Sequence, residues 1–402
     1  MSNIPKLRFP EFSGEWEEKR LDSLSLINPK PGDLPEVFSY IDLESVKNGV
    51  LLQEKIIKKE EAPSRAQRLL EEKDILFQTV RPYQRNNYFF NSKSPTVAST
   101  GYAQFRVNKN NYPSFLYQYL YTNNFVKNVL DRCSGTSFPA ISTNDLLEIC
   151  LHIPSLPEQQ KIADFLSNVD SIITAETKIL NALQKKKKAL MQKLFTRQLR
   201  FKSDDGTDFP AWEEKKLGDV CSVLSGKRVP KGNKLTSVNT GLKYITVSDM
   251  GDKFVSNKDI KYITQEIETK IKKYKVITGD IIISVAGTLG KVNIITEEFN
   301  NANLTENCDK LTEFKGCITE YLFYFLQSEK FLDEINRIKT SSAQPKLALD
   351  RLRIFVIPIP IIEEQQKIAD CLSSIDSLIQ TQQKVVTTWQ QRKKALLQQM
   401  FV

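Results

Sequence analysis

EQQKIAD occupies residues 158–164, and the same seven residues recur at 364–370. The likeness extends outward from them: at an offset of 206, residues 158–195 match residues 364–401 at 20 of 38 positions. Chance similarity does not reach that level. The two stretches are therefore copies of one helix-forming segment, and they define the chain as a tandem duplication.

The regions in front of the two copies also correspond, although less closely. The apolar runs KDILF (73–77) and GDIII (279–283) align at the same offset and are typical of buried strands. FPEFSGEWEEKRL and FPAWEEKKL align through Trp16 and Trp212 at an offset of 196, so the second unit carries insertions. Each copy thus consists of a globular unit followed by a helix. Apolar positions at helical spacing are shared as well: Phe115, Leu116, Leu120, Phe125 and Val129 in the first unit, and Tyr321, Leu322, Leu326, Phe331 and Ile335 in the second.

The two globular units differ most over residues 22–70 and 220–273. Divergence on a shared framework would let one scaffold read two different partners. Simple drift in surface loops is the alternative, and the repeat alone leaves both explanations open.

Each repeated stretch predicts a long helix. Ser155 and Glu158 form the S-x-x-E pattern of a capping box, and Pro157 fits the first turn, so the first helix should begin near Leu156. About 38 helical residues would span roughly 57 Å, more than a compact domain needs. Apolar residues recur at 4,3 spacing in both copies, which predicts a coiled-coil seam. The seam residues are Ile162, Leu166, Val169, Ile173, Leu180, Leu183, Leu190 and Leu194 in the first copy, and Ile368, Leu372, Ile375, Ile379, Val386, Trp389, Leu396 and Met400 in the second.

Polar residues interrupt both seams at the same two places, Glu176 and Lys187 in the first helix and Gln382 and Lys393 in the second. Interruptions of this kind set the register, because a slip would place polar groups against leucines. For an antiparallel pair we predict that Glu176 faces Lys393 and that Lys187 faces Gln382. A solvated edge for these four residues is the alternative. The same register predicts two apolar pairs, Leu180 with Trp389 and Ile173 with Leu396.

These patterns predict an α/β fold in which two globular domains alternate with two long helices that pair as an antiparallel coiled coil, a pseudo-twofold tandem repeat. Such a pair would hold the globular units at opposite ends of a rod. That arrangement would suit duplex DNA, with each unit reading a half-site about one helical turn from the other. We expect the domain boundaries to give the segments 1–154, 155–198, 199–360 and 361–402.

Composition limits the possible classes of protein. With 402 residues and 40% hydrophobic content, the chain is large enough for two or three packed domains. It has no apolar run of the roughly 18 residues that a membrane helix needs, and its first residues lack a signal-peptide core, so we expect a cytoplasmic protein. The net charge of +9 favours a polyanionic partner, although it also serves solubility.

Sequence motifs for catalysis are largely missing. There is no GxxxxGK[ST] phosphate loop and no GxGxxG, and a single histidine, His152, excludes HExxH. The six cysteines lack metal-ligand spacing. The EEK triplet at 71–73 resembles part of a nuclease site, but EEK recurs at Glu17 and Glu213, as chance predicts in so charged a chain. We therefore expect no catalytic residue, no metal and no cofactor bound by this chain.

Several loops instead carry side chains that donate hydrogen bonds to bases and phosphates. QTVRPYQRNNYFF (78–90) is rich in guanidinium and amide groups, which can contact guanine and adenine edges. Its counterpart SVAGTLGKV (284–292) is rich in glycine and would allow close approach to phosphate. SGTSFPAIS (134–142) aligns with SSAQPKLAL (341–349). The candidate DNA-binding residues are Arg65, Arg68, Arg81, Tyr83, Gln84, Arg85, Asn87, Ser137, Lys227, Arg228, Lys291, Gln344 and Lys346.

Nearly the whole chain resembles the specificity subunit of type I restriction-modification systems. The residues that carry the resemblance are the EWEEKRL and AWEEKKL openings, KDILF and GDIII, IPSLPEQQKIADFLSNVD with IPIIEEQQKIADCLSSID, and the KKKKALMQKLF and RKKALLQQMF endings. The resemblance implies two α/β target recognition domains, each reading one half of a split DNA target. It also implies that the helices act as a ruler and as a docking surface for two methylation subunits, which carry S-adenosylmethionine. A restriction subunit would add translocation and cleavage driven by ATP with magnesium, and the specificity subunit itself would not be a catalyst.

Two other classes of protein compete with this interpretation. A self-contained nuclease would alter DNA with magnesium and without any partner. A coiled-coil adaptor without DNA contact would show no sequence-specific DNA binding. The resemblance and the missing catalytic motifs favour the DNA-reading scaffold over both.

Overall fold

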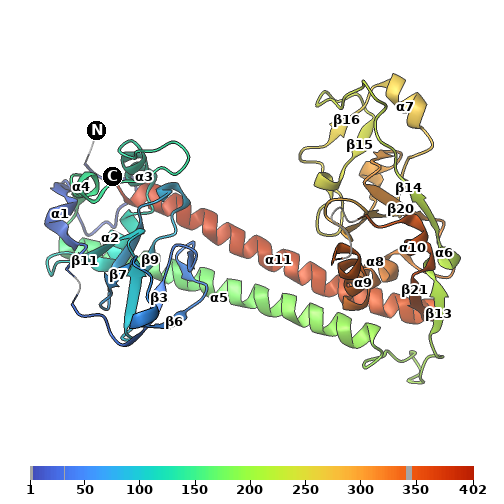
Figure 1. The fold of residues 1–402 in the computed structure, drawn as a ribbon, viewed down its shortest axis with the longest axis horizontal. Coiled ribbons are helices and arrows are strands. Elements are labelled where there is room, and N and C mark those ends of the chain that lie inside the picture. The colour runs from blue at the N-terminus through green and yellow to red at the C-terminus, as the bar shows by residue number, and fades with distance from the viewer. Residues whose placement is uncertain (1–2, 31, 341–345) are drawn as a thin grey trace. The chain divides into compact units, whose positions relative to one another are not determined.

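The computed structural model divides into two compact units, and each is a mixture of sheets and helices (Figure 1). Unit 1 comprises Met1–Ile179 and Gln382–Val402, and unit 2 comprises Leu180–Thr381. Each unit therefore contains one globular part and a portion of both long helices, α5 (Leu156–Phe195) and α11 (Ile362–Met400). Helix α5 begins at Leu156, as the sequence predicts. The structure describes residues 3–30, 32–340 and 346–402.

The described residues of unit 1 form two four-stranded sheets and two short strand pairs. The first sheet is antiparallel, with the order β2 (Ser25–Ile27), β11 (Tyr102–Val107), β8 (Ile75–Gln78) and β9 (Tyr88–Phe89). The second has the order β6 (Lys55–Lys58), β3 (Val37–Ile41), β10 (Thr96–Ser99) and β7 (Ala66–Leu69), with β3 and β10 parallel. The strand pairs are β1 (Glu17–Arg20) with β12 (Cys150–Ile153) and β4 (Val46–Lys47) with β5 (Val50–Leu51). The short helices are α1 (Leu21–Leu24), α2 (Pro113–Tyr119), α3 (Asn123–Leu130) and α4 (Thr143–Leu147).

Unit 2 repeats this plan with a smaller second sheet. Its main sheet is antiparallel, with the order β14 (Ser222–Ser225), β20 (Cys308–Thr312), β17 (Ile281–Ser284) and β18 (Val292–Ile294). The second sheet has the order β16 (Lys261–Tyr262), β15 (Lys243–Ile245) and β19 (Asn303–Leu304), and β13 (Glu213–Lys216) pairs with β21 (Val356–Ile359). The short helices are α6 (Leu217–Val220), α7 (Gln265–Ile271), α8 (Thr319–Phe325), α9 (Glu329–Thr340) and α10 (Leu349–Ile354).

The KDILF and GDIII runs lie in β8 and β17, and all four residues of each strand are buried. Their surroundings match in register, since Ile75 lies opposite Phe105 and Ile281 lies opposite Leu311. The apolar residues that the sequence placed at helical spacing in both halves are buried as well, in α2, α3, α8 and α9 and the turns between them. The main sheet of unit 2 is thus a structural copy of that of unit 1.

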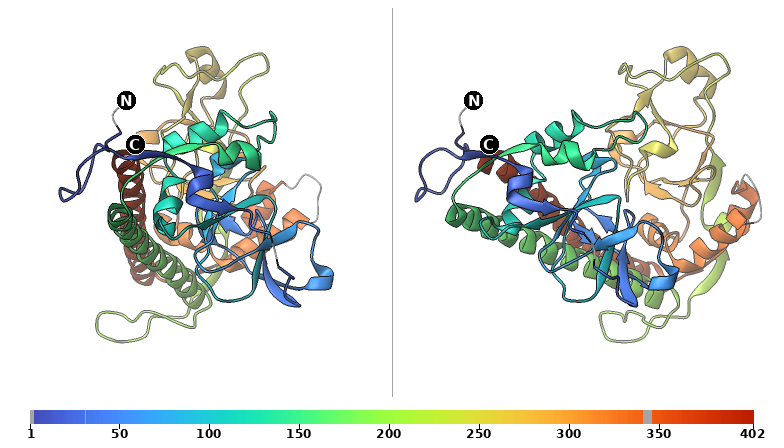
Figure 2. Two further views of the ribbon diagram at one scale, coloured as in Figure 1. Left: turned by 90° about the vertical axis from the view of Figure 1, so that its left-hand side faces the viewer. Right: turned by 60° about the vertical axis from the view of Figure 1, so that its left-hand side comes forward.

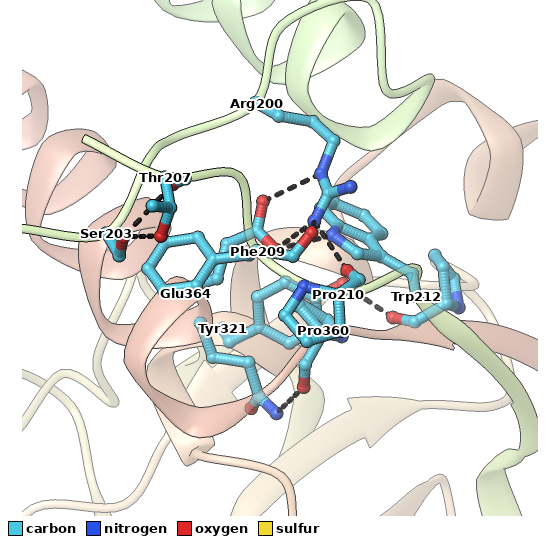
Figure 3. Close-up of polar contacts among 11 residues, drawn as sticks. Arg200, Ser203, Thr207, Phe209, Pro210, Trp212, Tyr321, Pro360 and Glu364 are labelled. Carbon is cyan, nitrogen blue, oxygen red and sulfur yellow. Dashed lines mark hydrogen bonds and ion pairs between the residues drawn. The ribbon is translucent and has the colours of Figure 1, made fainter. Parts of the chain in front are cut away.

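The repeated EQQ residues anchor each long helix to a globular part. In unit 2 the fully buried Glu364 carboxylate accepts hydrogen bonds from the Arg200 guanidinium at 3.1 and 2.7 Å and from Trp212 Nε1 at 2.8 Å (Figure 3). Arg200 also donates to the carbonyl oxygens of Phe209 and Pro210. The hydrogen bond to Glu364 raises the pKa of Arg200. The buried charge is therefore matched by donors, as a buried carboxylate requires.

Unit 1 has the same anchor. The Glu158 carboxylate accepts from the Arg8 guanidinium through both oxygens, each at 2.8 Å, and from Trp16 Nε1 at 3.3 Å. We expected Glu158 to form a capping box with Ser155. This prediction is wrong, because the Glu158 carboxylate is bound by Arg8 and Trp16 of the globular part. Two tryptophans that align in sequence thus share one role, which is to fix the start of a long helix.

The glutamine that follows each glutamate is equally fixed. Gln159 accepts from the Tyr112 N–H at 2.9 Å, and Gln365 accepts from the Ile318 N–H at 2.9 Å. Each side chain also donates to a carbonyl oxygen of the loop in front of its helix, at 3.0 and 2.8 Å. Buried polar contacts of this kind tolerate few substitutions, because a lost partner leaves an unpaired group. This explains why these residues are identical in the two copies.

The end of each long helix completes the apolar core of a globular part. In unit 1 the ring of Phe401 lies 5.2 Å from that of Phe115 and 5.1 Å from that of Tyr119. In unit 2 the ring of Phe195 lies 5.8 Å from that of Tyr321. Full burial of a phenylalanine contributes about 1.5–3 kcal/mol. Each unit therefore depends on residues from both copies of the repeat.

Within unit 1, α5 and α11 lie side by side and run antiparallel (Figure 2). Their contacts show a register that differs from the prediction. The Gln382 amide donates to the Glu176 carbonyl oxygen at 3.0 Å and also to its carboxylate. Lys393 forms an ion pair with Asp170 at 2.6 Å. The predicted pairing of Glu176 with Lys393 is therefore wrong. All four polar seam residues are half-buried, so they do not form a solvated edge.

The same correction applies in unit 2, where Lys187 forms an ion pair with Asp376 at 2.6 Å instead of the predicted contact with a glutamine. Asp376 also accepts from the Tyr324 hydroxyl at 2.7 Å, just as Asp170 accepts from the Gln118 amide at 2.8 Å in unit 1. This register is favoured because each lysine gains a carboxylate that the globular part also holds.

The predicted apolar pairs, Leu180 with Trp389 and Ile173 with Leu396, required the predicted register. Because the observed register differs, these pairs do not form. Trp389 lines a groove of unit 1 together with Val169 and Ile172, and Leu396 lines the same groove. The tryptophan therefore packs on an earlier turn of α5 than the one that carries Leu180.

Candidate nucleic-acid interface

In each unit, the loop after the central strand lies against the segment in front of a short helix. Val80 forms a β-bridge with Ala140 in unit 1, and Ala286 forms the corresponding bridge with Lys346 in unit 2. The two candidate segments of each half, which the sequence presents separately, are therefore neighbours in space. The variable polar residues of each unit gather at this junction.

Arg81 is held in unit 1 by stacking. Its guanidinium carbon lies 4.2 Å from the centre of the Phe138 ring, and its main-chain N–H donates to the Pro139 carbonyl oxygen at 2.7 Å. Its φ of 54° is left-handed, which costs a non-glycine residue on the order of 1 kcal/mol or more. Among the described residues Arg81 Nε has no hydrogen-bond partner, and Phe138 is 62% exposed. The loop thus fixes a cation on an exposed aromatic ring.

Three other predicted residues stabilise this loop. Arg85 donates to the Tyr121 carbonyl oxygen at 2.9 Å. Asn87 is buried, and its side-chain oxygen accepts from the Gln78 N–H at 3.0 Å. Gln84 accepts from the Gln78 side chain at 2.8 Å. These contacts hold the backbone that presents Arg81.

The remaining predicted residues of unit 1 differ in exposure. Tyr83 is 50% exposed, and Arg65 and Ser137 are exposed as well. Arg68 is half-buried, and burial lowers the pKa of its guanidinium. Tyr83, Arg65 and Ser137 are therefore accessible to a ligand, whereas Arg68 is largely covered by its own unit.

Unit 2 has a cleft of about 570 Å³ at the same kind of junction. Three predicted residues, Lys227, Arg228 and Lys346, line it together with Asp309. Both lysines are exposed, and Arg228 forms an ion pair with Glu306. The basic side chains of Lys227, Arg228 and Lys346 form the rim of the cleft, here called the basic rim, and the buried Asp309 carboxylate lies inside it.

One predicted residue of unit 2, Lys291, does not line this cleft. The Lys291 ammonium donates to the Met250 carbonyl oxygen, and its main-chain N–H donates to the Ser284 hydroxyl at 2.9 Å. Lys291 therefore serves the glycine-rich loop itself. Gln344 lies outside the described residues.

Phe138 and Asp309 were not singled out from the sequence. An aromatic residue among small polar ones, in SGTSFPAIS, is the signal that could have found Phe138. For Asp309 the signal is the alignment itself, because the offset of 206 places it at Ala103, a buried core residue of unit 1. The second copy thus has an ionisable aspartate at a position where the first copy has an apolar alanine.

The arrangement of the acidic, histidine and cysteine side chains offers little for metal or thiol chemistry. Across residues 3–30, 32–340 and 346–402, no group of three or more histidine, cysteine, aspartate or glutamate side chains could hold a metal ion. All six cysteines are free, and burial raises the pKa of Cys221 and of Cys308 to about 12. Within the same ranges, no helix combines the length and the apolar character needed to cross a membrane.

The paired helices of unit 1 form an apolar groove of about 430 Å³. Phe165, Val169 and Ile172 of α5 line it on one side, and Trp389 and Leu396 of α11 line it on the other. Phe165 is 37% exposed although it belongs to the repeated stretch. Apolar surface of this kind on a helix pair is typical of a protein-binding site.

The family model of the type I restriction modification DNA specificity domain matches residues 14–185 and 211–388, once on each repeat. The chain therefore belongs to this family. It is similar to the type I restriction enzyme MjaVIII specificity subunit of Methanocaldococcus jannaschii, with 26% identity over 409 residues that cover 97% of this chain and 92% of that relative. It is also similar to the EcoBI specificity subunit of Escherichia coli, with 24% identity over 255 residues, 58% of this chain and 53% of that relative.

Two solved structures share the fold. A chain from work on complex assembly and conformational transition of the type I R-M system has a TM-score of 0.60 and 23% identity, with 96% of this chain and 97% of that chain covered. The type I restriction-modification S subunit from M. genitalium has a TM-score of 0.57 and 17% identity, with 99% of both chains covered. At these identities the likeness establishes the architecture.

Proposed function

We propose that this chain is the DNA-recognition subunit of a type I restriction-modification complex, that it reads a split target, and that it catalyses no reaction itself. The observation that carries the proposal is that two copies of one frame present different polar groups at equivalent junctions. Arg81 stands on Phe138 in unit 1, and Asp309 lies inside a basic cleft in unit 2. A protein that contacted only the DNA backbone would have no use for this difference.

Within this proposal, the segments 1–154 and 199–360 are the two target recognition domains, and 155–198 and 361–402 are the helical regions. The guanidinium of Arg81 suits bidentate contact with guanine O6 and N7. The exposed lysines at the rim of the unit 2 cleft suit phosphate contacts, which position the protein without reading sequence.

We further propose that the long helices dock two methylation subunits. The apolar groove of unit 1 is one docking face. The residue of α11 that matches Ile172 is Leu378, which is 56% exposed in unit 2. Two copies of one apolar face suit two copies of one partner. In this assembly S-adenosylmethionine belongs to the methylation subunits, and ATP with magnesium belongs to the restriction subunits.

The recognition proposal is tested by exchanging one unit. The chain is produced with its methylation subunits, and methylated bases are mapped in the DNA of the host. Replacing residues 1–150 by the matching unit of a relative should change one half of the target, and replacing 199–360 should change the other half. A change of both halves by one exchange, or the absence of any split target for the unaltered chain, would contradict the proposal.

The docking proposal needs a separate test. Trp389→Lys places a charge in the groove of unit 1, and it should abolish binding of a methylation subunit there in a pull-down with purified partners. Gln391→Lys is the matched control, because Gln391 is an exposed residue of the same helix. Equal partner binding by the two variants would rule out the groove as the docking face.

A further inference from the structure

The cleft of unit 2 has one wall of fixed backbone. A Cβ atom added at Gly226 would lie 2.0 Å from the Thr305 carbonyl oxygen, so only glycine fits. The Gly226 N–H donates to the Cys308 carbonyl oxygen at 2.9 Å, and the Lys227 N–H donates to the Leu304 carbonyl oxygen at 2.8 Å. These contacts hold the start of the basic rim at a constant distance from β20. Backbone contacts of the fold therefore hold this wall of the cleft in place.

Asp309 lies on β20 at this wall, and its carboxylate is not matched by the fold. The residue is 2% exposed, and its Oδ2 atom receives no hydrogen bond from any residue that the structure describes. Burial raises the pKa of Asp309 to about 7, although the charges of Lys346 and Arg353 act to lower it. A buried carboxylate without a donor costs free energy, and native proteins keep few such groups.

The fold itself does not require this carboxylate. Asp309 lies opposite Ile283 on β17, and in unit 1 the corresponding position opposite Phe77 is Ala103. Ala103 is 1% exposed and packs in the apolar core. The same sheet thus forms with a methyl group at this place. An unmatched charge that the architecture can do without is better explained by a ligand than by stability.

Building on the function proposed above, we propose that Asp309 is a specificity-determining residue of unit 2. The cleft would take the exocyclic amino group of a cytosine or an adenine in the half of the target that unit 2 reads. The Asp309 carboxylate supplies the acceptor that such an amino group needs.

The chemistry of the cleft supports this ligand class. At pH 8, above the pKa of Asp309 of about 7, the ionised carboxylate only accepts hydrogen bonds, so it selects the N–H donors of cytosine and adenine. It rejects the acceptor atoms at the edges of guanine and thymine, and it repels phosphate. Lys227 and Lys346 provide the positive charge that a DNA site needs, whereas Arg228 is paired with Glu306. Phosphate contacts at the rim would bring a base edge to the carboxylate.

The first test is Asp309→Ala in the full chain, assembled with its methylation subunits. Alanine is chosen because unit 1 folds with alanine at this position. In the map of methylated sites, one position of the unit 2 half should become degenerate, with discrimination falling roughly 5- to 150-fold, the factor that corresponds to about 1–3 kcal/mol. The unit 1 half should stay unchanged. The variant should also melt at a higher temperature than the unaltered chain at pH 8.

Asp280→Asn is the matched control. Asp280 is also a buried carboxylate of unit 2 and directly precedes β17, but it accepts from the Ile277 N–H at 2.9 Å. The control should leave both halves of the target unchanged. If Asp309→Ala leaves both halves of the target unchanged, the inference fails while the proposed function stands. If the unaltered chain directs methylation to no split target, the proposed function itself fails.

A second test distinguishes the two sources of the amino group. At the position identified by Asp309→Ala, binding is measured with DNA carrying 2-pyrimidinone in place of cytosine, or unsubstituted purine in place of adenine. The unaltered complex should lose affinity for whichever analogue replaces the natural base, and the Asp309→Ala complex should not distinguish the analogue from that base. Equal affinity of the unaltered complex for the natural base pair and for the pair that lacks this amino group would overturn the inference.

Discussion

Unit 1 and unit 2 place opposite charges at equivalent junctions of one frame. Unit 1 presents a guanidinium on an exposed ring, whereas unit 2 encloses a carboxylate below a basic rim. The sheets beneath them share strand order and register. In the proposed function, a few side chains at the loop junction reverse the ligand preference while the architecture stays the same.

The two sites also differ in what they cost the fold. Arg81 is half-buried and stacks on Phe138, so it loses only part of its hydration in addition to the cost of its left-handed backbone. A buried carboxylate loses its hydration, so Asp309 reduces the stability of unit 2 at neutral pH. Stability measurements can therefore separate the two units as well as binding measurements can.

The largest effect is expected at the helix anchors, which the two units share. Glu158→Ala and Glu364→Ala each leave an arginine without its carboxylate, at a cost of about 3–5 kcal/mol. The loss should be greater in unit 1, because the side chain of Arg8 is 13% exposed and that of Arg200 is 29% exposed. Urea unfolding followed by tryptophan fluorescence measures both, and the exposed neighbour Glu363→Ala is the control. A loss no larger than that of the control would show that the anchors are dispensable.

The next effect concerns unit 2 and depends on pH. The pKa of Asp309 is raised from 3.8 to about 7 by burial, so the folded state binds a proton that the unfolded state releases between these values. Stability contributed by this proton is present below about pH 4 and is lost as pH rises towards 7. Relative to the unaltered chain, Asp309→Ala should therefore gain stability over this window, on the order of a few kcal/mol above pH 7. The charged groups around the carboxylate are Lys227, Arg228, Glu306, Lys346 and Arg353.

This pH prediction is checked by urea unfolding of both proteins from pH 4 to pH 8. Ala103→Asp provides the reciprocal experiment, because it places the unit 2 carboxylate in the unit 1 core. Ala103→Asp should destabilise the protein most above pH 7. A stability difference between Asp309→Ala and the unaltered chain that does not vary with pH would mean that Asp309 has a partner in solution.

A smaller effect is expected at the unit 1 site. Arg81→Ala should cost about 1–3 kcal/mol of DNA binding and should relax the target at one position of the unit 1 half. Phe138→Ala should relax the same position by a smaller amount, because it removes the ring on which the guanidinium stacks. Fluorescence titration with targets varied at single positions measures both. An equal loss for every DNA sequence would identify Arg81 as a phosphate contact instead.

The smallest effect concerns the helix register. Double-mutant cycles of Asp170→Ala with Lys393→Ala, and of Lys187→Ala with Asp376→Ala, should each give a coupling of about 0.5–1 kcal/mol. The unit 2 pair should couple more strongly, because its side chains are 18% and 16% exposed, against 17% and 37% for Lys393 and Asp170. Additive effects in both cycles would contradict the observed register.

The sequence predicts the architecture well because the duplication doubles every signal. A strand such as Ile75–Gln78 is supported by its copy, and the 4,3 spacing identifies the seam. The register is harder to predict, because the partners of the lysines are Asp170 and Asp376, which lie outside the run of seam positions. The pairing of Glu158 with Arg8 could not be predicted from the sequence either, because the two residues are far apart in the chain and only the folded globular part brings them together.

The site is predicted as a region but not residue by residue. Sequence alignment locates the two loops of each half, and the β-bridge at Val80 shows that they meet. It does not reveal that Asn87 is buried or that Lys291 bonds to its own unit, because those roles depend on the path of the backbone. Asp309 was missed because a lone aspartate in a strand looks ordinary until its burial is known.

The position of Phe401 in the core of unit 1 has a consequence for synthesis on the ribosome. Unit 2 is one continuous stretch, whereas unit 1 must wait for Gln382–Val402 before Phe401 can cover Phe115 and Tyr119. At about 5–20 residues per second, translation of Leu180–Thr381 takes on the order of 10–40 s. During that time the nascent unit 1 has an open apolar surface, so a chain that stalls inside unit 2 would be a substrate for chaperones and proteases. Truncated specificity chains would in this way be removed before they could compete for partner subunits.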